Sequence, residues 1–110
     1  MSNYEITLDG SDNGDHTAVQ LWKLEGDKRM LVDSQTIEPV YLPPAQQSSL
    51  EYIRRVYEVP AYVGFKVRYQ GFPGVITGAA DSYLMVKLDG DTMPRRFHPT
   101  WEMKYFSEGL

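Results

Sequence analysis

Two neighbouring arginines followed by aromatic side chains are the residues of this chain best suited to binding. The stretch RRFHPTW, residues 95–101, places Arg95 and Arg96 beside Phe97 and contains Trp101 at its end. A guanidinium group stacks on flat rings and clamps carboxylates through paired hydrogen bonds. The same residues are also typical of a solvated edge strand, whose charges prevent pairing with another sheet. The stretch therefore predicts either a binding rim or a protected edge.

Histidine is scarce, which limits metal and acid–base chemistry. His16 and His98 are the two histidines, and the chain has no cysteine. Structural zinc needs four nitrogen or sulfur ligands, so these residues do not suffice for such a site. His98 precedes Pro99, and we expect its ring to fix a turn by a backbone hydrogen bond, with a place on a binding surface as the alternative. The sequence contains no G-x-S-x-G motif, and we predict no catalytic residue, no metal and no cofactor.

The segment DGSDNGD, residues 9–15, partly matches a calcium-binding loop. The matching positions are Asp9, Ser11, Asn13 and Gly14. Gln20 stands where the bidentate glutamate of such a loop belongs, and the flanking residues have a strand pattern. Aspartate, asparagine and glycine also make the local hydrogen bonds of ordinary turns. We therefore expect a solvated loop.

Residues 67–91 contain several glycines, which suggest either a phosphate-binding loop or tight turns. A phosphate-binding loop needs G-x-x-x-x-G-K-[ST] leading into a helix, whose N–H groups face the phosphate. Gly71, Gly74 and Gly78 lead instead into VITG and YLMVKL, which have strand patterns. The glycines are therefore expected to supply the turns and bends of a small curled sheet.

Charge is divided unevenly along the 110 residues, whose net charge is −4. Residues 1–60 carry five bases against ten acids, a net of −5, and residues 61–110 carry six bases against five acids, a net of +1. An acidic half repels phosphate backbones, which argues against nonspecific nucleic-acid binding. The sequence has no secretory leader pattern and no apolar run of about 18–20 residues, so we expect a cytoplasmic protein without membrane contact.

Residues 1–46 are predicted to form an antiparallel β-meander that ends in a proline-rich connector. Alternating apolar residues and turn-forming segments predict strands over 3–8, 17–25 and 30–37. Pro39, Pro43 and Pro44 lack the N–H group that a sheet requires, so the connector is extended. An exposed edge strand in this meander would favour a homodimer.

Residues 47–60 are predicted to form a capped amphipathic helix. Ser48 and Glu51 have the spacing of a capping box, and Pro60 ends the helix. The predicted apolar stripe consists of Leu50, Ile53, Val56 and Tyr57. Since so short a helix is unstable alone, this stripe must dock on a sheet.

Residues 61–110 are predicted to form a five-stranded barrel, which makes the chain mostly β with one short helix. The expected strands are 62–69, 75–79, 83–89, 95–97 and 101–106, with a turn over 70–74 and a single helical turn over 98–100. The predicted core consists of Val67, Tyr69, Val75, Ile76, Leu84, Val86, Leu88, Phe97 and Trp101.

The stretch VGFKVRYQGFPGVITGA resembles the KOW and Tudor-like group of SH3-like barrels. The residues that carry the resemblance, which covers about residues 61–106, are Gly64, Val67, Tyr69, Gly71, Gly74 and Ile76. KOW-like barrels imply contact with RNA or the transcription machinery, and Tudor-like barrels imply capture of a modified side chain in an aromatic cage. The order of GVITGA, VKLDGD and FHPTWE also resembles small proteins of tailed phages and prophages.

These patterns predict a non-enzymatic module that binds a protein partner, with a phage-encoded accessory or host-modulating role implied by the phage resemblance. Aromatic and arginine side chains dominate the energetics of protein interfaces. The predicted binding residues are Tyr69, Phe72, Tyr83, Arg95, Arg96, His98 and Trp101. The alternative is a KOW-like module that binds nucleic acid through a basic stripe, formed by Lys66, Arg68, Lys87, Arg95, Arg96 and Lys104.

Overall fold

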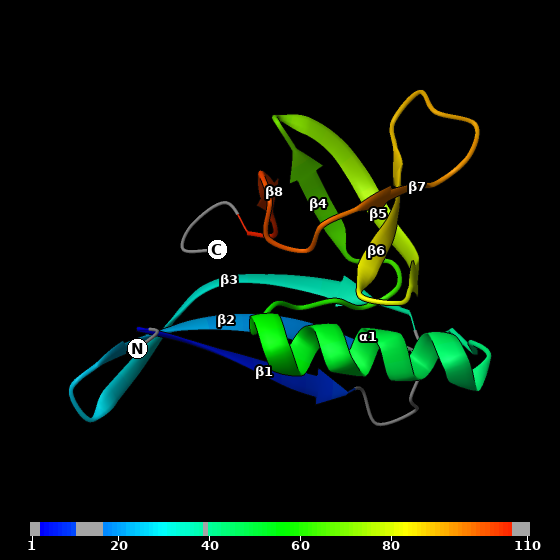
Figure 1. Cartoon of the computed structure of the whole chain (residues 1–110). Helices are drawn as coiled ribbons and strands as arrows, with labels where there is room; N and C mark the ends of the chain where they lie inside the picture. The colour runs from blue at the N-terminus through cyan, green and yellow to red at the C-terminus, as the bar shows by residue number, and fades with distance from the viewer. Residues whose placement is uncertain (1–2, 11–16, 39, 107–110) are drawn as a thin grey trace.

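The computed structural model describes residues 3–10, 17–38 and 40–106, and within these ranges the chain forms eight strands and one helix (Figure 1). In chain order they are β1 (Tyr4–Gly10), β2 (Thr17–Glu25), β3 (Lys28–Ile37), α1 (Pro44–Tyr57), β4 (Lys66–Tyr69), β5 (Phe72–Ala80), β6 (Tyr83–Leu88), β7 (Arg95–Phe97) and β8 (Met103–Lys104). The mostly-β class with one helix is confirmed. In the described ranges, no helix has the length and apolar character needed to cross a bilayer.

The first three strands form an antiparallel sheet in the order β1-β2-β3, as the meander pattern predicts. Ile6 pairs with Leu21, so their side chains share a face, and Leu21 is fully buried there. The opposite face is more exposed and mixes polar and apolar side chains: the Trp22 indole N–H donates to Thr7 Oγ1 at 2.7 Å, and Leu31 lies opposite Trp22. One face of this sheet therefore belongs to the core. A homodimer through edge strand β1 stays a prediction.

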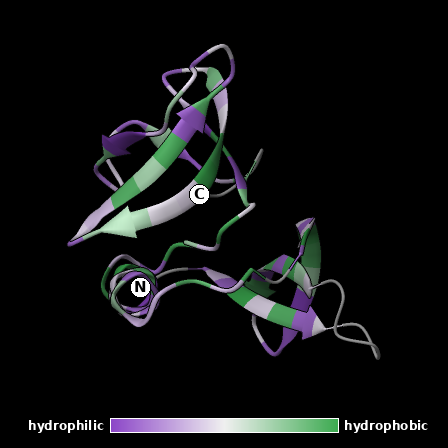
Figure 2. Ribbon diagram, turned by 90° about the vertical axis from the view of Figure 1, so that its right-hand side faces the viewer, coloured by the Kyte–Doolittle hydropathy of each residue, from purple (hydrophilic) through white to green (hydrophobic). Residues whose placement is uncertain are grey.

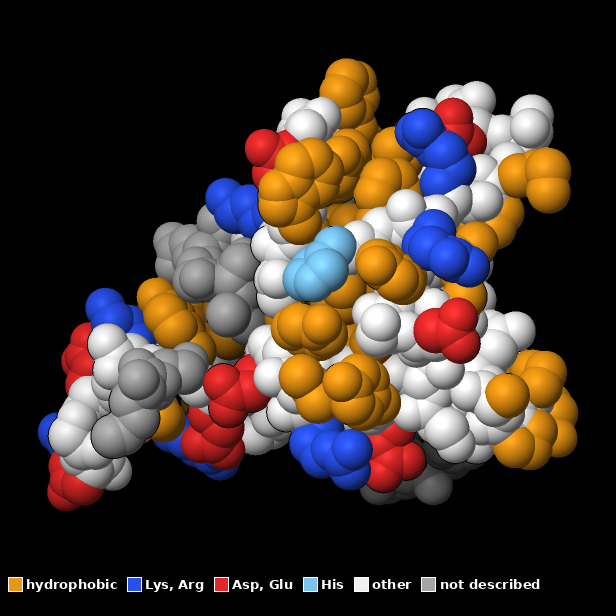
Figure 3. Space-filling view, in the orientation of Figure 1, with side chains coloured by type: hydrophobic (Ala, Val, Ile, Leu, Met, Phe, Trp, Pro, Cys, Tyr) orange, Lys and Arg blue, Asp and Glu red, His pale blue; other side chains and the backbone are white. Residues whose placement is uncertain are grey.

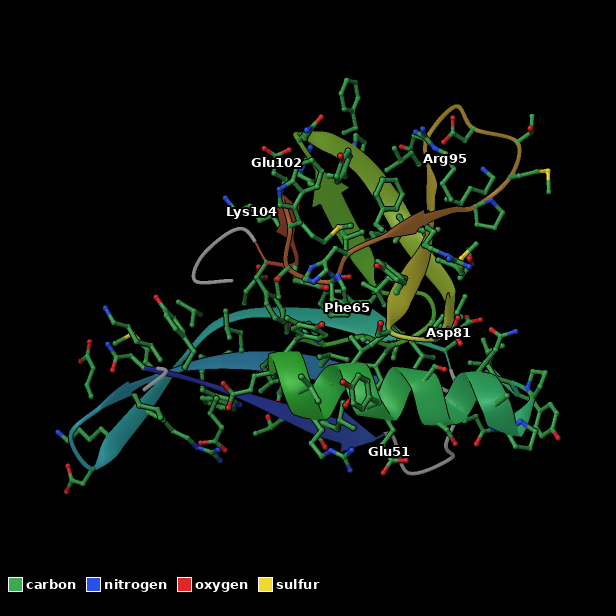
Figure 4. All side chains as sticks on the ribbon, viewed as in Figure 1. Glu51, Phe65, Asp81, Arg95, Glu102 and Lys104 are labelled. Carbon is green, nitrogen blue, oxygen red and sulfur yellow. The ribbon has the colours of Figure 1, made fainter. Side chains whose placement is uncertain are left out.

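The predicted capping box of Ser48 and Glu51 is wrong, because the helix begins at Pro44. Pro43 is the N-cap residue, and no side chain caps the helix. Proline suits the first helical turn, since its φ is fixed near the helical value and an N–H there has no partner within the helix. Two N–H groups of that turn donate to the Pro43 carbonyl at 3.0 and 3.1 Å. Glu51 lies within the helix and points away from the five-stranded sheet (Figure 4).

The apolar stripe of α1 is narrower than the sequence predicts. Leu50 and Ile53 are buried and Tyr57 is half-buried, as expected. Val56 is 48% exposed, which makes its predicted place in the stripe wrong. At about 100° per residue, Val56 projects from the flank of the line that the other three side chains form.

The second sheet has the strand order β7-β6-β5-β4-β8, and every neighbouring pair is antiparallel. Its first hairpin turns on Gln70 and Gly71, whose φ values of 50° and 86° fit a two-residue type I′ turn. The predicted turn over 70–74 is therefore too long, because two left-handed residues already reverse the chain. Phe72 and Pro73 belong to β5 instead.

The closing segment is less regular than predicted. The expected strand over 101–106 is reduced to the two residues of β8, and residues 98–100 form no helical turn. The Thr100 N–H donates to His98 Nδ1 at 3.1 Å, and a side chain that binds the backbone in this way competes with helix formation. The identification of the sheet as an SH3-like barrel stays a prediction.

A single hydrophobic core joins the two sheets and the helix. Figure 2 shows α1 between the two sheets, with the five-stranded sheet above the helix and the three-stranded sheet beside it. Phe65 is fully buried between these layers (Figure 4), and its ring centroid lies 6.3 Å from that of Tyr105 and 5.2 Å from that of Phe106. Of the predicted core, the buried members are Val67, Ile76, Leu84, Val86 and Leu88, and the half-buried ones are Tyr69, Val75 and Phe97.

Trp101 is 58% exposed, so its predicted place in the core is wrong. It lies in the irregular bend before β8. The side chains that fill the core from this segment are Pro99 before it and Met103 after it. Since these two already hold the bend against the core, the indole is left on the surface.

The Gln35 side chain ties β3 to the five-stranded sheet. Its amide oxygen accepts the Lys66 N–H at 2.8 Å, and its Nε2 donates to the Lys66 carbonyl at 2.9 Å. The same Nε2 lies 3.3 Å from the Tyr105 carbonyl. The Gln35 side-chain amide therefore bonds the main-chain N–H and carbonyl groups at the start of β4, where a neighbouring strand would otherwise pair.

Gln35→Glu tests this tie. A carboxylate still accepts the Lys66 N–H but faces two carbonyl oxygens without a proton to donate. We expect the free energy of unfolding at neutral pH, measured by urea denaturation, to fall by about 1–3 kcal/mol. Gln20→Glu is the matched control, because Gln20 Oε1 accepts the Thr7 hydroxyl at 3.1 Å and a carboxylate keeps this acceptor role. Equal stabilities of Gln35→Glu and the unmodified chain would contradict the role of the amide.

Tyr105 links core packing to pH. Burial raises the pKa of its phenol above the ordinary value of 10.0, and the hydroxyl donates to the Pro99 carbonyl at 2.5 Å. Above pH 10.0 the phenol in the unfolded chain loses its proton, whereas the folded chain keeps it. Unfolding then releases a proton, so stability is complete below this pH and falls as the pH rises.

Tyr105→Phe should remove this pH dependence. Between about pH 9 and pH 11 the stability advantage of the unmodified chain over the variant is expected to shrink by about 1.4 kcal/mol, as measured by urea denaturation. Tyr41→Phe, at a tyrosine that is 84% exposed, serves as the control and should show no such change. A constant difference between Tyr105→Phe and the unmodified chain would refute the prediction.

Candidate functional site

Three rings and one arginine form what we call the rim cluster: Tyr69, Phe97, Trp101 and Arg95. The Tyr69 ring lies 4.5 Å from Phe97 and 6.0 Å from Trp101, measured between centroids. The Arg95 guanidinium lies 5.7 Å from the Phe97 ring centre. Since Tyr69 and Phe97 are half-buried, Trp101 presents most of the exposed aromatic surface of this cluster.

A second group, the histidine cluster, consists of Tyr57, Tyr83, Arg96 and His98. The His98 ring makes edge contacts with Tyr57, at 5.3 Å, and with Tyr83, at 6.4 Å. The Arg96 guanidinium lies 5.5 Å from the Tyr83 ring centre. The sequence did not assign Tyr57 to the site, because it ends a helix far from the other members along the chain. Figure 3 shows a histidine side chain surrounded by hydrophobic side chains, with basic ones at the edge of this face.

Strand alternation separates the two arginines, although they are adjacent in sequence. Arg95 is opposite Val86 and Arg96 is opposite Met85 in the β6–β7 register, so their side chains leave β7 on opposite faces. Arg95 also pairs with Asp91 at 3.0 Å. Each arginine is thus held beside one ring of a different cluster.

Phe72 pairs with Tyr69 across the β4–β5 hairpin but makes no ring contact with either cluster within the described ranges. It is 63% exposed at the start of β5, next to the Gln70–Gly71 turn. In the described ranges no ring contact joins it to Tyr69, Tyr83 or Trp101. Of the predicted binding residues, the structure therefore groups Tyr69 with Trp101 and Arg95, and Tyr83 with Arg96 and His98.

The predicted basic stripe is also divided. Lys66 and Lys87 both lie opposite Val75, and Arg68 lies opposite Lys104, so these four cations share one face of the five-stranded sheet. Arg95 leaves β7 on the face of buried Val86 instead. Arg96 is opposite Met85 and so shares the face of Lys87. This face of the sheet therefore presents five of the six predicted cations, and Arg95 is the one that leaves it.

His98 holds the bend that carries Trp101. Its Nδ1 accepts the Thr100 N–H at 3.1 Å and lies 3.2 Å from Thr100 Oγ1. This bond is the turn-fixing contact that the sequence suggests, and the ring also lies on the aromatic surface.

Among the described residues, no group of three or more His, Cys, Asp or Glu side chains is placed to hold a metal ion. The calcium-loop residues Ser11, Asn13 and Gly14, together with His16, lie outside these ranges. In comparisons with known proteins, no family model, curated protein or solved structure matches this chain.

The bond from Thr100 predicts the tautomer of His98. Because Nδ1 accepts a hydrogen bond, the neutral ring must carry its proton on Nε2. Long-range ¹H–¹⁵N NMR spectra, recorded where imidazole is neutral, should show this form. A His16→Gln variant removes the other histidine and isolates the signals. A proton on Nδ1 would contradict the geometry of the bend.

Proposed function

We propose that this chain is a non-enzymatic module that binds a protein partner through the rim and histidine clusters. The observation that carries the proposal is Trp101, an indole that is 58% exposed while it contacts Tyr69. Tryptophan, tyrosine and arginine are the residues most enriched among those that dominate binding energy. The rim cluster contains all three residue types, and the histidine cluster contains tyrosine and arginine.

The arginines support this proposal because contacts already restrain them. The Arg96 guanidinium lies against Tyr83, and Arg95 lies near Phe97 while it pairs with Asp91. Ordering a flexible side chain on binding costs about 0.5–1.5 kcal/mol. Side chains that are already held in place lose less freedom when a partner binds.

The SH3-like resemblance and the phage resemblance are part of the proposal. The strand order β7-β6-β5-β4-β8, with the last strand returning beside β4, supports an SH3-like barrel. The similarity to small tailed-phage proteins supports a phage-encoded accessory or host-modulating role, with a host protein as the partner.

Nucleic-acid binding is the alternative, and it would use the five cations on the outer face of the sheet. The net charge of −4 opposes nucleic-acid binding, because a long polyanion is repelled by the negative charge of the chain as a whole. It predicts affinity that falls steeply with salt, which a gel-shift titration at two salt concentrations measures.

Paired alanine substitutions test the proposed binding face. A partner protein is captured from lysate of the source cells and purified. Its affinity is then measured by titration for the unmodified chain and for the double variant that carries Trp101→Ala and Arg96→Ala. We expect affinity to fall at least about thirtyfold, the effect of losing about 2 kcal/mol at an interface. Both side chains are exposed, so the variant should stay folded.

The control is Tyr41→Ala with Arg55→Ala, which removes an exposed aromatic residue and an exposed arginine elsewhere. This variant should bind the partner as the unmodified chain does. Equal losses in the two variants, or saturable binding that survives the first, would refute the proposed face.

A further inference from the structure

A groove with a volume of about 770 Å³ is lined by β3, β4, β5 and β8. Its basic side chains are Lys66, Arg68 and Lys104, and Pro73 and Val75 contribute apolar surface beside them. None of the residues of the rim and histidine clusters lines it. The groove is therefore separate from the face proposed above.

Among the described residues, no acidic side chain forms an ion pair with the three cations of the groove. Arg68 and Lys104 are direct cross-strand neighbours, and Lys66 lies two residues before Arg68 on the same face. Like charges directly opposite each other destabilise a sheet. In the described ranges other cations form the ion pairs, and Arg68 reaches only a neutral acceptor, the Gly71 carbonyl, at 3.3 Å. An anionic ligand would relieve this repulsion.

We propose that the groove binds an extended acidic segment of a protein. Charge complementarity selects the carboxylates, since Lys66, Arg68 and Lys104 are exposed and gathered on one side. Lys66 and Arg68 are two residues apart on β4 and share one face, which is the spacing of alternate side chains along an extended ligand. The ligand class is thus a peptide with carboxylates at alternate positions.

The lining favours a peptide over single-stranded RNA. Proteins that bind single strands stack the bases on exposed aromatic rings. The aromatic residues of this groove, Tyr105 and Phe106, are only 4% and 2% exposed, so they offer no such platform. Asp33 and Asp89 also line the groove, so a peptide bound there would place its carboxylates against the cations and its N–H groups against these two acids.

Fluorescence anisotropy with a defined probe tests the proposal. The probe is a labelled peptide of alternating glutamate and valine, about eight residues long, which spans about 26 Å when extended. We expect saturable binding to the unmodified chain that weakens as sodium chloride is raised. The same peptide with glutamine in place of glutamate, and an oligouridylate of equal length, should bind at least about tenfold more weakly.

A matched pair of variants locates the site. Arg68→Gln with Lys104→Gln should weaken peptide binding about tenfold. The variant should also unfold at the same or a higher temperature, because the like-charge pair is gone. Lys28→Gln with Arg55→Gln makes the same change in net charge outside the groove and should leave affinity within about twofold.

Three results would overturn the proposal. The first is equal binding of the glutamate and glutamine peptides, and the second is equal loss in the two variants. The third is tighter binding of the oligouridylate, which would assign the groove to nucleic acid. The outcome does not depend on the aromatic face, since Trp101→Ala with Arg96→Ala should bind the acidic peptide normally.

Discussion

The structure depends on one constraint: the three-stranded sheet must share its core with the other elements. Within the described ranges, its buried apolar side chains are Val19, Leu21 and Ile37. So few buried residues do not stabilise a small sheet by themselves, because the entropy lost on folding has to be matched by buried apolar area. Phe65 fills the space between the layers, and Gln35 satisfies main-chain groups where the layers meet.

The same constraint positions the binding residues. The segment between β7 and β8 is held at its ends by Phe97, which contacts Tyr69, and by buried Met103. Between them Pro99 is buried, and its carbonyl accepts the Tyr105 hydroxyl. The bend therefore presents Trp101 outward from a fixed backbone. A site built in this way loses little conformational freedom when it binds.

Local patterns predicted the elements well and their ends less well. The strands over 17–25 and 95–97 were predicted to the residue, because turn-forming residues flank runs of strand-forming ones. The helix start was missed because Pro44 looks like part of a connector, although proline also suits a first turn. Trp101 was misplaced because a large apolar side chain suggests the core, whereas its exposure depends on which neighbours already fill it.

The candidate site was predictable as a set of residue types and not as an arrangement. Adjacent residues of a strand point to opposite faces, so the separation of Arg95 and Arg96 could be predicted from the local sequence alone. The contact between Tyr57 and His98 joins the end of a helix to a distant bend, and no local pattern encodes such a pairing.

Charge gives the two proposed sites different selectivity. The first half of the chain has a net charge of −5, and its strand β3 forms one wall of the cationic groove. A diffuse polyanion is repelled by this half wherever it approaches, whereas a short acidic segment needs attraction at only a few points. Cations set beside an acidic sheet therefore favour ligands whose carboxylates match their positions, and disfavour ligands with uniform charge. The aromatic face depends mainly on burial of rings, so its affinity should respond little to the salt that weakens the groove.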